Sequence, residues 1–321
     1  MDLAVAAAQP PTPTIGFGTA ALGSQCAAVV TMALEAGFRT FDTAEAPYWY
    51  DQTAVGGALH SFLTLLPECE DIPTACVEEG LMISTKIPPW ELTSAENIRF
   101  QAKQSQETLL GFCSTDYDDT SNTQRKYPLD VYFIHAPQCW RGWHPQCVTG
   151  NEATLSLREA WLAMEQVVHV DHSARRIGLS NVSPTELLDI IQFAKSRGAD
   201  GYMPDVLQAH ADPLRPATEL RRICEEHGIE FLSYSTLGTQ HVMSSRNTQK
   251  NPVLTNSLIV DLAEYYGRST AEVVLSWAIQ KGMSVIPRSS KRAHIMELAN
   301  LIYNPPFLEE AHLYAIDMLG Q

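Results

Sequence analysis

Short apolar segments that favour β-strands alternate with longer helical segments along almost the whole chain. Strands are predicted at residues 15–18, 39–42, 81–86, 128–137, 176–181, 206–208, 229–234 and 284–287. Helices are predicted at about 24–34, 53–65, 93–110, 155–169, 183–198, 217–227, 257–266 and 269–280, with a last one towards residue 301. This alternation predicts parallel strands joined by helices, and eight repeats predict an α/β protein with a closed (β/α)8 TIM barrel. No G-x-G-x-x-G fingerprint follows a strand, which disfavours a doubly wound sheet.

The chain of 321 residues fits a single barrel domain, and we expect residues 1–13 to form a loose N-terminal arm. Capping boxes at Thr93–Glu96, Ser183–Glu186 and Ser269–Glu272 predict where three of the helices begin. Two polar stretches interrupt the alternation. Residues 67–80 are expected to form a surface excursion, and residues 114–127 an inserted loop.

Composition excludes several classes of partner. The chain has 22 basic and 37 acidic residues, and its net charge of −15 argues against nucleic acid. No apolar run reaches the roughly 18 residues that span a bilayer, and the N-terminus lacks the features of a signal peptide, so we expect a cytoplasmic protein without a membrane segment. The seven cysteines show no CxxC pair and no zinc spacing, which predicts reduced thiols and no metal site.

Three neighbouring predicted strands each end in a polar side chain. Asp42 ends the second predicted strand, Lys86 the third and His135 the fourth. Because the carboxyl ends of barrel strands converge on one face, we expect these side chains within a few ångströms of one another. Each has a plain structural interpretation, a satisfied core histidine or a buried Asp–Lys pair. Their convergence instead favours an active site.

A tyrosine, Tyr48 or Tyr50, lies on the loop after the second strand. A phenol is a poor acid at neutral pH, but a neighbouring ammonium lowers its pKa. A carboxylate can hold that ammonium, and a neutral imidazole can orient a carbonyl oxygen against the phenol. The four side chains together predict a device that donates a proton.

The motifs in their order resemble the aldo-keto reductase family. They are Ile15-Gly-Phe-Gly-Thr19, Phe41-Asp-Thr-Ala44, Ser84-Thr-Lys86, Asp130-Val-Tyr-Phe-Ile-His135, Ile177-Gly-Leu-Ser-Asn181, Leu207-Gln208, Ser233-Tyr-Ser-Thr-Leu-Gly238 and Val285-Ile-Pro-Arg-Ser289. The resemblance implies a TIM barrel that binds NADPH without a Rossmann domain. It further implies a monomer that reduces small aldehydes or ketones to alcohols.

The resemblance also implies roles for individual residues. The catalytic set is Asp42, Tyr50, Lys86 and His135, with Tyr48 as the alternative to Tyr50. The cofactor-binding set is Gly18, Thr19, Ser180, Asn181, Gln208, Tyr234, Ser235, Leu237, Gly238, Arg288, Ser289 and Glu297. In it Ser180, Asn181 and Gln208 hold the nicotinamide carboxamide, and Tyr234 stacks on the ring. Gly238 and its neighbours cover the pyrophosphate, while Arg288 and Ser289 grip the 2′-phosphate.

Two regions depart from the family pattern. The family spaces its tyrosine as Asp-Thr-Ala-x-x-Tyr, but that position is Pro47 here, and the loop is about two residues longer. A turn at Ala46–Pro47 would bring Tyr50 into the pocket and leave Tyr48 at its rim, so Tyr50 is favoured. Near the adenine end His294 replaces a second arginine and Leu298 replaces an asparagine, while Glu297 is kept.

Two other functions stay open at this point. The altered tyrosine spacing would suit a non-catalytic NADPH-binding regulator, and Lys86 would suit a Schiff-base isomerase or lyase on the same barrel. The loops carry Trp90, Trp140, Trp143 and His144, which are predicted to rim the pocket. An aromatic rim favours apolar or aromatic carbonyl substrates.

Overall fold

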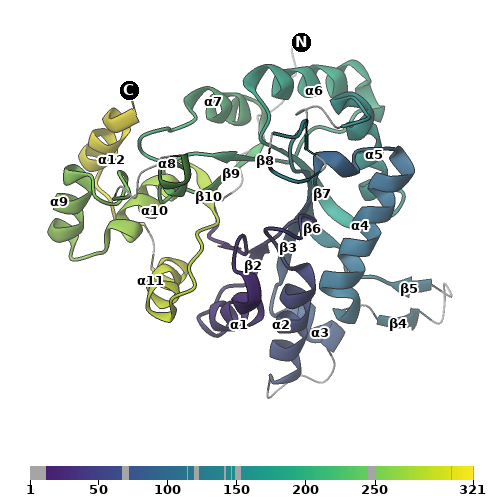
Figure 1. The fold of residues 1–321 in the computed structure, drawn as a ribbon, viewed down its shortest axis with the longest axis horizontal. Helices are drawn as coiled ribbons and strands as arrows, with labels where there is room; N and C mark the ends of the chain where they lie inside the picture. The colour runs from purple at the N-terminus through teal and green to yellow at the C-terminus, as the bar shows by residue number, and fades with distance from the viewer. Residues whose placement is uncertain are drawn as a thin grey trace, which may run out of the picture.

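The computed structural model describes residues 12–66, 72–113, 115–118, 123–140, 142–145, 147–148, 153–244, 250–304 and 306–320. Eight parallel strands stand side by side in the order β1 (Phe17–Gly18), β2 (Thr40–Asp42), β3 (Met82–Ile87), β6 (Leu129–Ile134), β7 (Ala174–Ser180), β8 (Val206–His210), β9 (Glu230–Tyr234) and β10 (Met283–Val285). Ile15 bridges Val285 in parallel, so the first and last strands meet. The predicted (β/α)8 barrel is confirmed (Figure 1).

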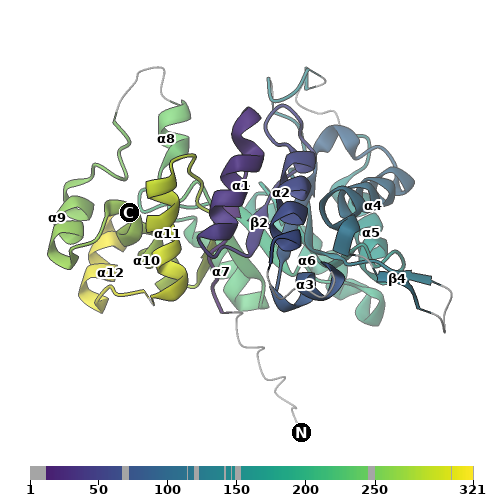
Figure 2. The ribbon, with the colours of Figure 1, turned by 90° about the horizontal axis from the view of Figure 1, so that it is seen from below.

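Helices surround the strands, as Figures 1 and 2 show. They are α1 (Cys26–Glu35), α2 (Gln52–Thr64), α3 (Ile72–Glu78), α4 (Ala95–Leu110), α5 (Leu157–His169), α6 (Pro184–Ser196), α7 (Thr218–His227), α8 (Thr239–Ser244), α9 (Ser257–Tyr266), α10 (Thr270–Gln280), α11 (Arg292–Tyr303) and α12 (Glu310–Asp317). Short 3₁₀ turns lie at Gly23–Gln25, Pro89–Glu91, Gly111–Cys113, Gly198–Asp200 and Met318–Gly320. No helix in these described ranges has the length and apolar character needed to cross a membrane.

Side-chain caps set the starts of several helices. The capping boxes predicted before α6 and α10 are confirmed. At α4 the prediction is wrong by one residue, because the hydroxyl of Ser94, rather than Thr93, accepts the backbone N–H of Asn97. The hydroxyl that ends an extended segment is the one placed to reach the third helical N–H.

The two polar stretches are more regular than predicted. Residues 72–78 of the first stretch form helix α3. The second contains an antiparallel pair, β4 (Thr115–Asp118) with β5 (Thr123–Arg125), so the expected inserted loop is instead a hairpin at the side of the barrel. Its sequence has no apolar run to reveal a strand. The predicted N-terminal arm lies almost wholly outside the described residues.

Four cysteines are paired, which corrects the prediction of reduced thiols. Disulfides join Cys76 to Cys113 and Cys139 to Cys147, with Cα–Cα distances of 5.8 and 5.4 Å. The first links α3 to the turn after α4, so the barrel fold brings together cysteines 37 positions apart in the sequence. Cys26 and Cys224 are free and buried, and Cys69 lies outside the described residues.

The interior of the barrel is filled by side chains. Val131, Phe133, Val206, Leu232 and Ile286 form a buried cluster, separate from the larger core between strands and helices. A filled barrel leaves room for a ligand only beyond the ends of its strands.

Candidate active site

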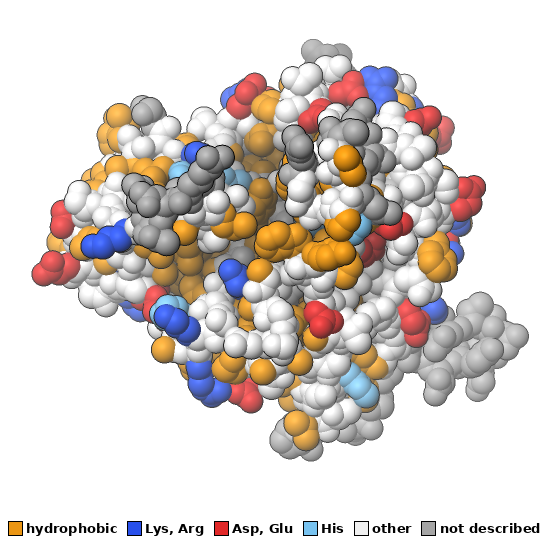
Figure 3. Space-filling view, viewed as in Figure 1, with side chains coloured by type: hydrophobic (Ala, Val, Ile, Leu, Met, Phe, Trp, Pro, Cys, Tyr) orange, Lys and Arg blue, Asp and Glu red, His pale blue; other side chains and the backbone are white. Residues whose placement is uncertain are grey.

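A cavity of about 370 Å³ opens at the carboxyl ends of the strands. Figure 3 shows this face with a hollow near its centre and hydrophobic side chains gathered around it. The lining residues predicted as site residues are Gly18, Asp42, Tyr50, His135, Asn181, Gln208, Tyr234, Ser235, Leu237 and Arg288. The structure therefore brings most of the predicted residues to one cavity.

Asp42 and Lys86 form a buried ion pair at the floor of the cavity. The Nζ atom of Lys86 lies 2.5 Å from Oδ2 of Asp42 and donates to the carbonyl oxygen of Thr43 at 2.7 Å. The other carboxylate oxygen of Asp42 accepts from Ser84 Oγ at 2.9 Å and from Gln208 Nε2 at 2.8 Å. Three strands, β2, β3 and β8, and the segment after β2 thus share one hydrogen-bonded centre. Burial lowers the pKa of Lys86, and Asp42 opposes that shift.

Tyr50 lies over this ion pair. Its ring centroid is 5.4 Å from Nζ of Lys86 and 6.0 Å from the ring centroid of His135. The backbone N–H groups of Trp49 and Tyr50 both donate to the carbonyl oxygen of Ala46, which forms a turn that directs Tyr50 inward. Tyr48 is 66% exposed and packs against the ring of His144 instead. Of the two tyrosines, Tyr50 is the one that lines the cavity.

The pKa of Tyr50 shifts opposite to the expectation from its neighbouring ammonium. Burial and the negative charge of Asp42 raise the pKa of Tyr50, while Arg288 opposes them more weakly. The expected lowering is wrong in this structure because burial, and after it the charge of Asp42, outweigh the positive charge near the phenol. Tyr50 therefore holds its proton at neutral pH.

His135 is buried at the edge of the same cavity. Burial and the charge of Lys86 hold the pKa of His135 well below its usual range, so its imidazole is neutral. Its Nδ1 atom is buried without a hydrogen-bond partner among the described residues. The ring of Trp143 packs perpendicular to it at 4.8 Å. A neutral imidazole in this place can orient a bound carbonyl oxygen.

Amide and aromatic groups also line the cavity. Asn181 donates from Nδ2 to the carbonyl oxygen of His135 at 2.9 Å and accepts from the Tyr234 hydroxyl at 2.7 Å. Burial raises the pKa of Tyr234 to about 12.

The exposed guanidinium of Arg288 donates to the carbonyl oxygen of Ala21 at 3.4 Å, beside Gly18. A Cβ at Gly18 would lie 3.0 Å from the carbonyl oxygen of Ile286, so a larger residue would crowd this wall.

Several predicted cofactor residues lie outside the cavity lining. Thr19 donates to the backbone oxygen of Asp42, and Ser180 accepts from Asn181. Ser289 accepts from the backbone of Lys291 next to His294, whereas Glu297 accepts from Ser269. Gly238 has φ of +80° and makes the turn before α8. Their predicted roles in binding stay predictions.

Aromatic side chains on loops close the remaining side. Trp140 and Trp143 both line the cavity and stack with centroids 4.0 Å apart. The disulfide of Cys139 with Cys147 brackets the loop that carries them. Trp90 and His144, also expected at the rim, stack on each other at 4.2 Å and lie outside the lining.

Sequence reasoning missed Ala20, Ala21, Trp49, Thr236, Thr239, Gln240, Met243, Ile286 and Pro287 as lining residues. The aromatic run at 48–50 was the one signal that pointed to Trp49.

Comparison with known proteins identifies the family. The model of the aldo/keto reductase family matches residues 14–314. The chain belongs to the aldo/keto reductase family. It is 29% identical to a glycerol 2-dehydrogenase (NADP(+)) of Hypocrea jecorina over 96% of this chain and 89% of that protein. It is 28% identical to an NAD(P)H-dependent D-xylose reductase of Pyricularia oryzae over 87% and 81% of the two chains. It is 26% identical to a 9,11-endoperoxide prostaglandin H2 reductase of Trypanosoma cruzi over 90% and 82%.

Proposed function

We propose that this protein is an NADPH-dependent reductase of small aldehydes and ketones, with Tyr50 as the proton donor. The observation that carries the proposal is the position of Tyr50 inside the cavity, over Lys86 and beside His135. Family membership and the names of the relatives support the reaction class and the cofactor. When bound, NADPH supplies the hydride that reaches the carbonyl carbon.

The side chains of the site divide the remaining tasks. The raised pKa of Tyr50 keeps its proton in place until a carbonyl oxygen gains negative charge. Lys86 then lies near the phenolate that remains, and Asp42 holds the ammonium. The neutral imidazole of His135 orients the carbonyl oxygen towards the phenol.

The donor set fits a nicotinamide dinucleotide. The amides of Asn181 and Gln208 suit a carboxamide, and the ring of Tyr234 offers a flat face beside them. At the other end the exposed guanidinium of Arg288 suits a phosphate. With Ser289 close by in the sequence, this cation supports a preference for NADPH over NADH.

We further propose that the substrates are apolar or aromatic carbonyls rather than sugars. Trp49, Trp140, Trp143 and Met243 all line the cavity and present apolar surface. The relatives carry names with glycerol, D-xylose and prostaglandin H2, which span polar and apolar substrates. The aromatic wall favours the apolar end of that range.

The geometry weakens the two alternatives. A non-catalytic regulator was suggested by the altered spacing of the tyrosine, yet Tyr50 still reaches the cavity. A Schiff base at Lys86 would require a neutral, accessible amine. Instead this amine is 1% exposed and bonded to Asp42 and the backbone of Thr43.

A spectrophotometric assay of NADPH consumption tests the proposal. We expect turnover with benzaldehyde, with kcat/KM about tenfold or more above that for D-xylose. Cofactor binding without turnover on any carbonyl would instead support the regulatory function. Higher kcat/KM for D-xylose would leave the reaction class in place and contradict the substrate class.

The assembly and location also stay predictions. We expect a monomer, which light scattering on the purified protein would test. The two disulfides weigh against the cytoplasmic location expected from the sequence, because reducing compartments keep thiols unpaired.

A further inference from the structure

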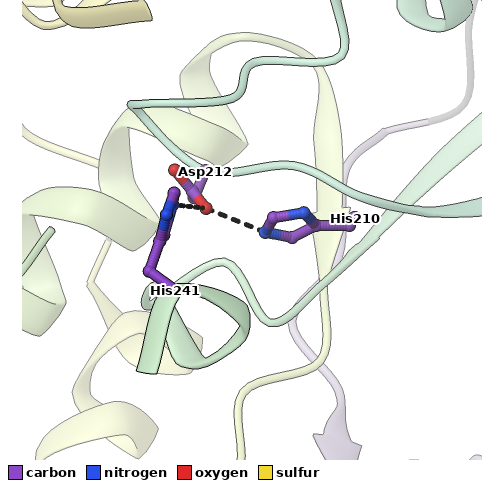
Figure 4. A group of neighbouring side chains, drawn as sticks. All are labelled: His210, Asp212 and His241. Atoms are coloured by element: carbon purple, nitrogen blue, oxygen red, sulfur yellow. Dashed lines mark hydrogen bonds and ion pairs between the residues drawn. The ribbon is translucent and has the colours of Figure 1, made fainter. Parts of the chain in front are cut away.

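We propose that His210, Asp212 and His241 form a binding site for a divalent transition-metal ion of the zinc class. The Nε2 atoms of His210 and His241 lie 2.8 and 2.9 Å from the same carboxylate oxygen, Oδ2 of Asp212. One ligand atom from each residue falls within 4.8 Å of the others. Figure 4 shows both imidazoles directed at this carboxylate from different segments of the chain.

The carboxylate of Asp212 is held in place by the backbone. Its Oδ1 atom accepts the N–H of Leu214 at 2.8 Å and the N–H of Arg215 at 3.1 Å. This leaves Oδ2 for the two imidazoles, and the side chain is 0% exposed. No lysine or arginine side chain among the described residues pairs with this buried carboxylate, so a cation at Oδ2 would compensate its charge. A carboxylate positioned in this way resembles a metal ligand held by its surroundings.

The donor set selects the class of ion. Two imidazole nitrogens and a carboxylate oxygen suit Zn²⁺ and neighbouring divalent metals, whereas Ca²⁺ and Mg²⁺ require mostly oxygen ligands. Three protein ligands leave a further position for water. The two imidazoles are 16% and 13% exposed, so an ion can reach the site from solvent.

The site connects two segments that border the cavity. His210 ends β8, Asp212 follows it, and His241 lies on α8. Thr239, Gln240 and Met243, in the same segment as His241, line the cavity. A bound ion would therefore fasten this segment to the barrel next to the cavity.

The competing interpretation is a pair of hydrogen bonds from two imidazoles to one carboxylate. It accounts for the distances without a metal, and the two interpretations differ in what zinc does. Under our proposal Zn²⁺ binds with a stoichiometry of one ion per chain and raises the melting temperature. Under the alternative it does neither.

The test uses the full chain without a histidine tag, stripped with EDTA and dialysed. Zn²⁺ is titrated against a chromophoric chelator, and Co²⁺ is added separately because its visible absorption reports a low coordination number. We expect one tight site in the parent protein, and at least about a tenfold loss of zinc affinity in His210→Gln and in His241→Gln. These two positions are partly exposed, so their variants are less disruptive than a change at the buried Asp212.

His227→Gln is the matched control, because His227 is half-buried on α7 and contacts Lys195 rather than a carboxylate. It should bind zinc as the parent does. Absence of stoichiometric zinc binding in the parent would overturn the proposal. Equal affinity in the parent and in both His210→Gln and His241→Gln would overturn it as well. Zinc binding is measured without NADPH, so its result is independent of the proposed reductase activity.

Discussion

The two sides of the central cavity are built from different kinds of structure. The strand-end wall consists of Asp42, His135, Asn181, Gln208 and Tyr234. Gln208 lies within β8, and the others lie at or just after the ends of β2, β6, β7 and β9. The loop wall consists of Trp49, Tyr50, Trp140 and Trp143, which lie on the loops after β2 and β6. The first wall is joined by hydrogen bonds between strands, and the second by ring packing and one disulfide.

This difference separates chemistry from substrate choice. Strands in a closed barrel hold polar side chains at fixed distances. The Asp42–Lys86 ion pair and the amides of Asn181 and Gln208 therefore keep their positions relative to one another. Loops can vary without disturbing the barrel, and here they carry the surface that a substrate would meet. Tyr50 is the exception, because the proposed proton donor stands on the loop wall and depends on the strand-end wall beneath it.

The largest effect is expected at the ion pair of the strand-end wall. Lys86→Met should abolish turnover while leaving NADPH affinity nearly unchanged, since the ammonium near Tyr50 is lost. It should also destabilise the fold by roughly 3–5 kcal/mol, because Asp42 is left buried without its partner. Kinetics and urea denaturation measure the two effects.

The double variant Lys86→Met with Asp42→Asn is the control for that prediction. It removes the unpaired charge, so stability should largely return while turnover stays absent. A folded Lys86→Met protein with parental turnover would contradict the role of the ammonium.

A smaller effect is expected at the nucleotide end of the cavity. Arg288→Glu should weaken NADPH binding by about 10–100-fold, in line with the roughly 1.5–3 kcal/mol of a charge-assisted hydrogen bond. NADH binding should change far less, because it lacks the 2′-phosphate. Fluorescence titration with both cofactors measures this, and equal losses would show that Arg288 does not contact that phosphate.

The loop wall should respond in substrate preference alone. Trp140→Ala removes a ring stacked on Trp143 and should lower kcat/KM for benzaldehyde by up to about tenfold. For a short aliphatic aldehyde kcat/KM should barely change, because such a substrate would not reach this ring. Equal losses for both substrates would mean that Trp140 supports the site as a whole, and the separation of the two walls would fail.

A separate prediction, outside the two walls, concerns stability against pH at Glu45, on the loop after β2. Burial raises the pKa of Glu45 from 4.5 to about 8, and hydrogen bonds from Ser105 and Tyr132 oppose the shift. Between these two values the folded protein holds a proton that the unfolded chain has released, so stability should fall as pH rises to about 8 and level off above it. Glu45→Gln mimics the protonated acid and should flatten this dependence in urea denaturation. An unchanged slope in the variant would contradict the buried neutral carboxyl.

Sequence reasoning found the strand-end wall because local pattern determines it. An apolar run that ends in one polar residue is typical of a barrel strand. Because the ends of barrel strands meet on one face, Asp42, Lys86 and His135 are then expected to converge. What the pattern could not supply was the partner of each group. Ser84 and Gln208 bond Asp42 across the sheet, and Gln208 does so over 166 residues of sequence.

The loop wall was harder to predict because tertiary contacts determine it. The loop of Cys139 and Cys147 is closed by a disulfide that no sequence spacing marked. Trp90, which was expected at the rim, lies outside the cavity lining and stacks on His144. The direction of the pKa shift at Tyr50 also depended on burial and on the charge of Asp42. The turn at Ala46 did place Tyr50 as the spacing argument had predicted.

The comparison of Tyr50→Phe with Tyr48→Phe tests the central claim most directly. Each variant loses one hydroxyl, one inside the cavity and one on an exposed side chain. Loss of a general acid costs about 10²–10⁴-fold in rate. We predict a fall of that size in kcat for NADPH-dependent benzaldehyde reduction in Tyr50→Phe, and nearly parental kcat in Tyr48→Phe. A dead Tyr48→Phe beside an active Tyr50→Phe would contradict the account, and full activity in both would show that neither tyrosine donates the proton.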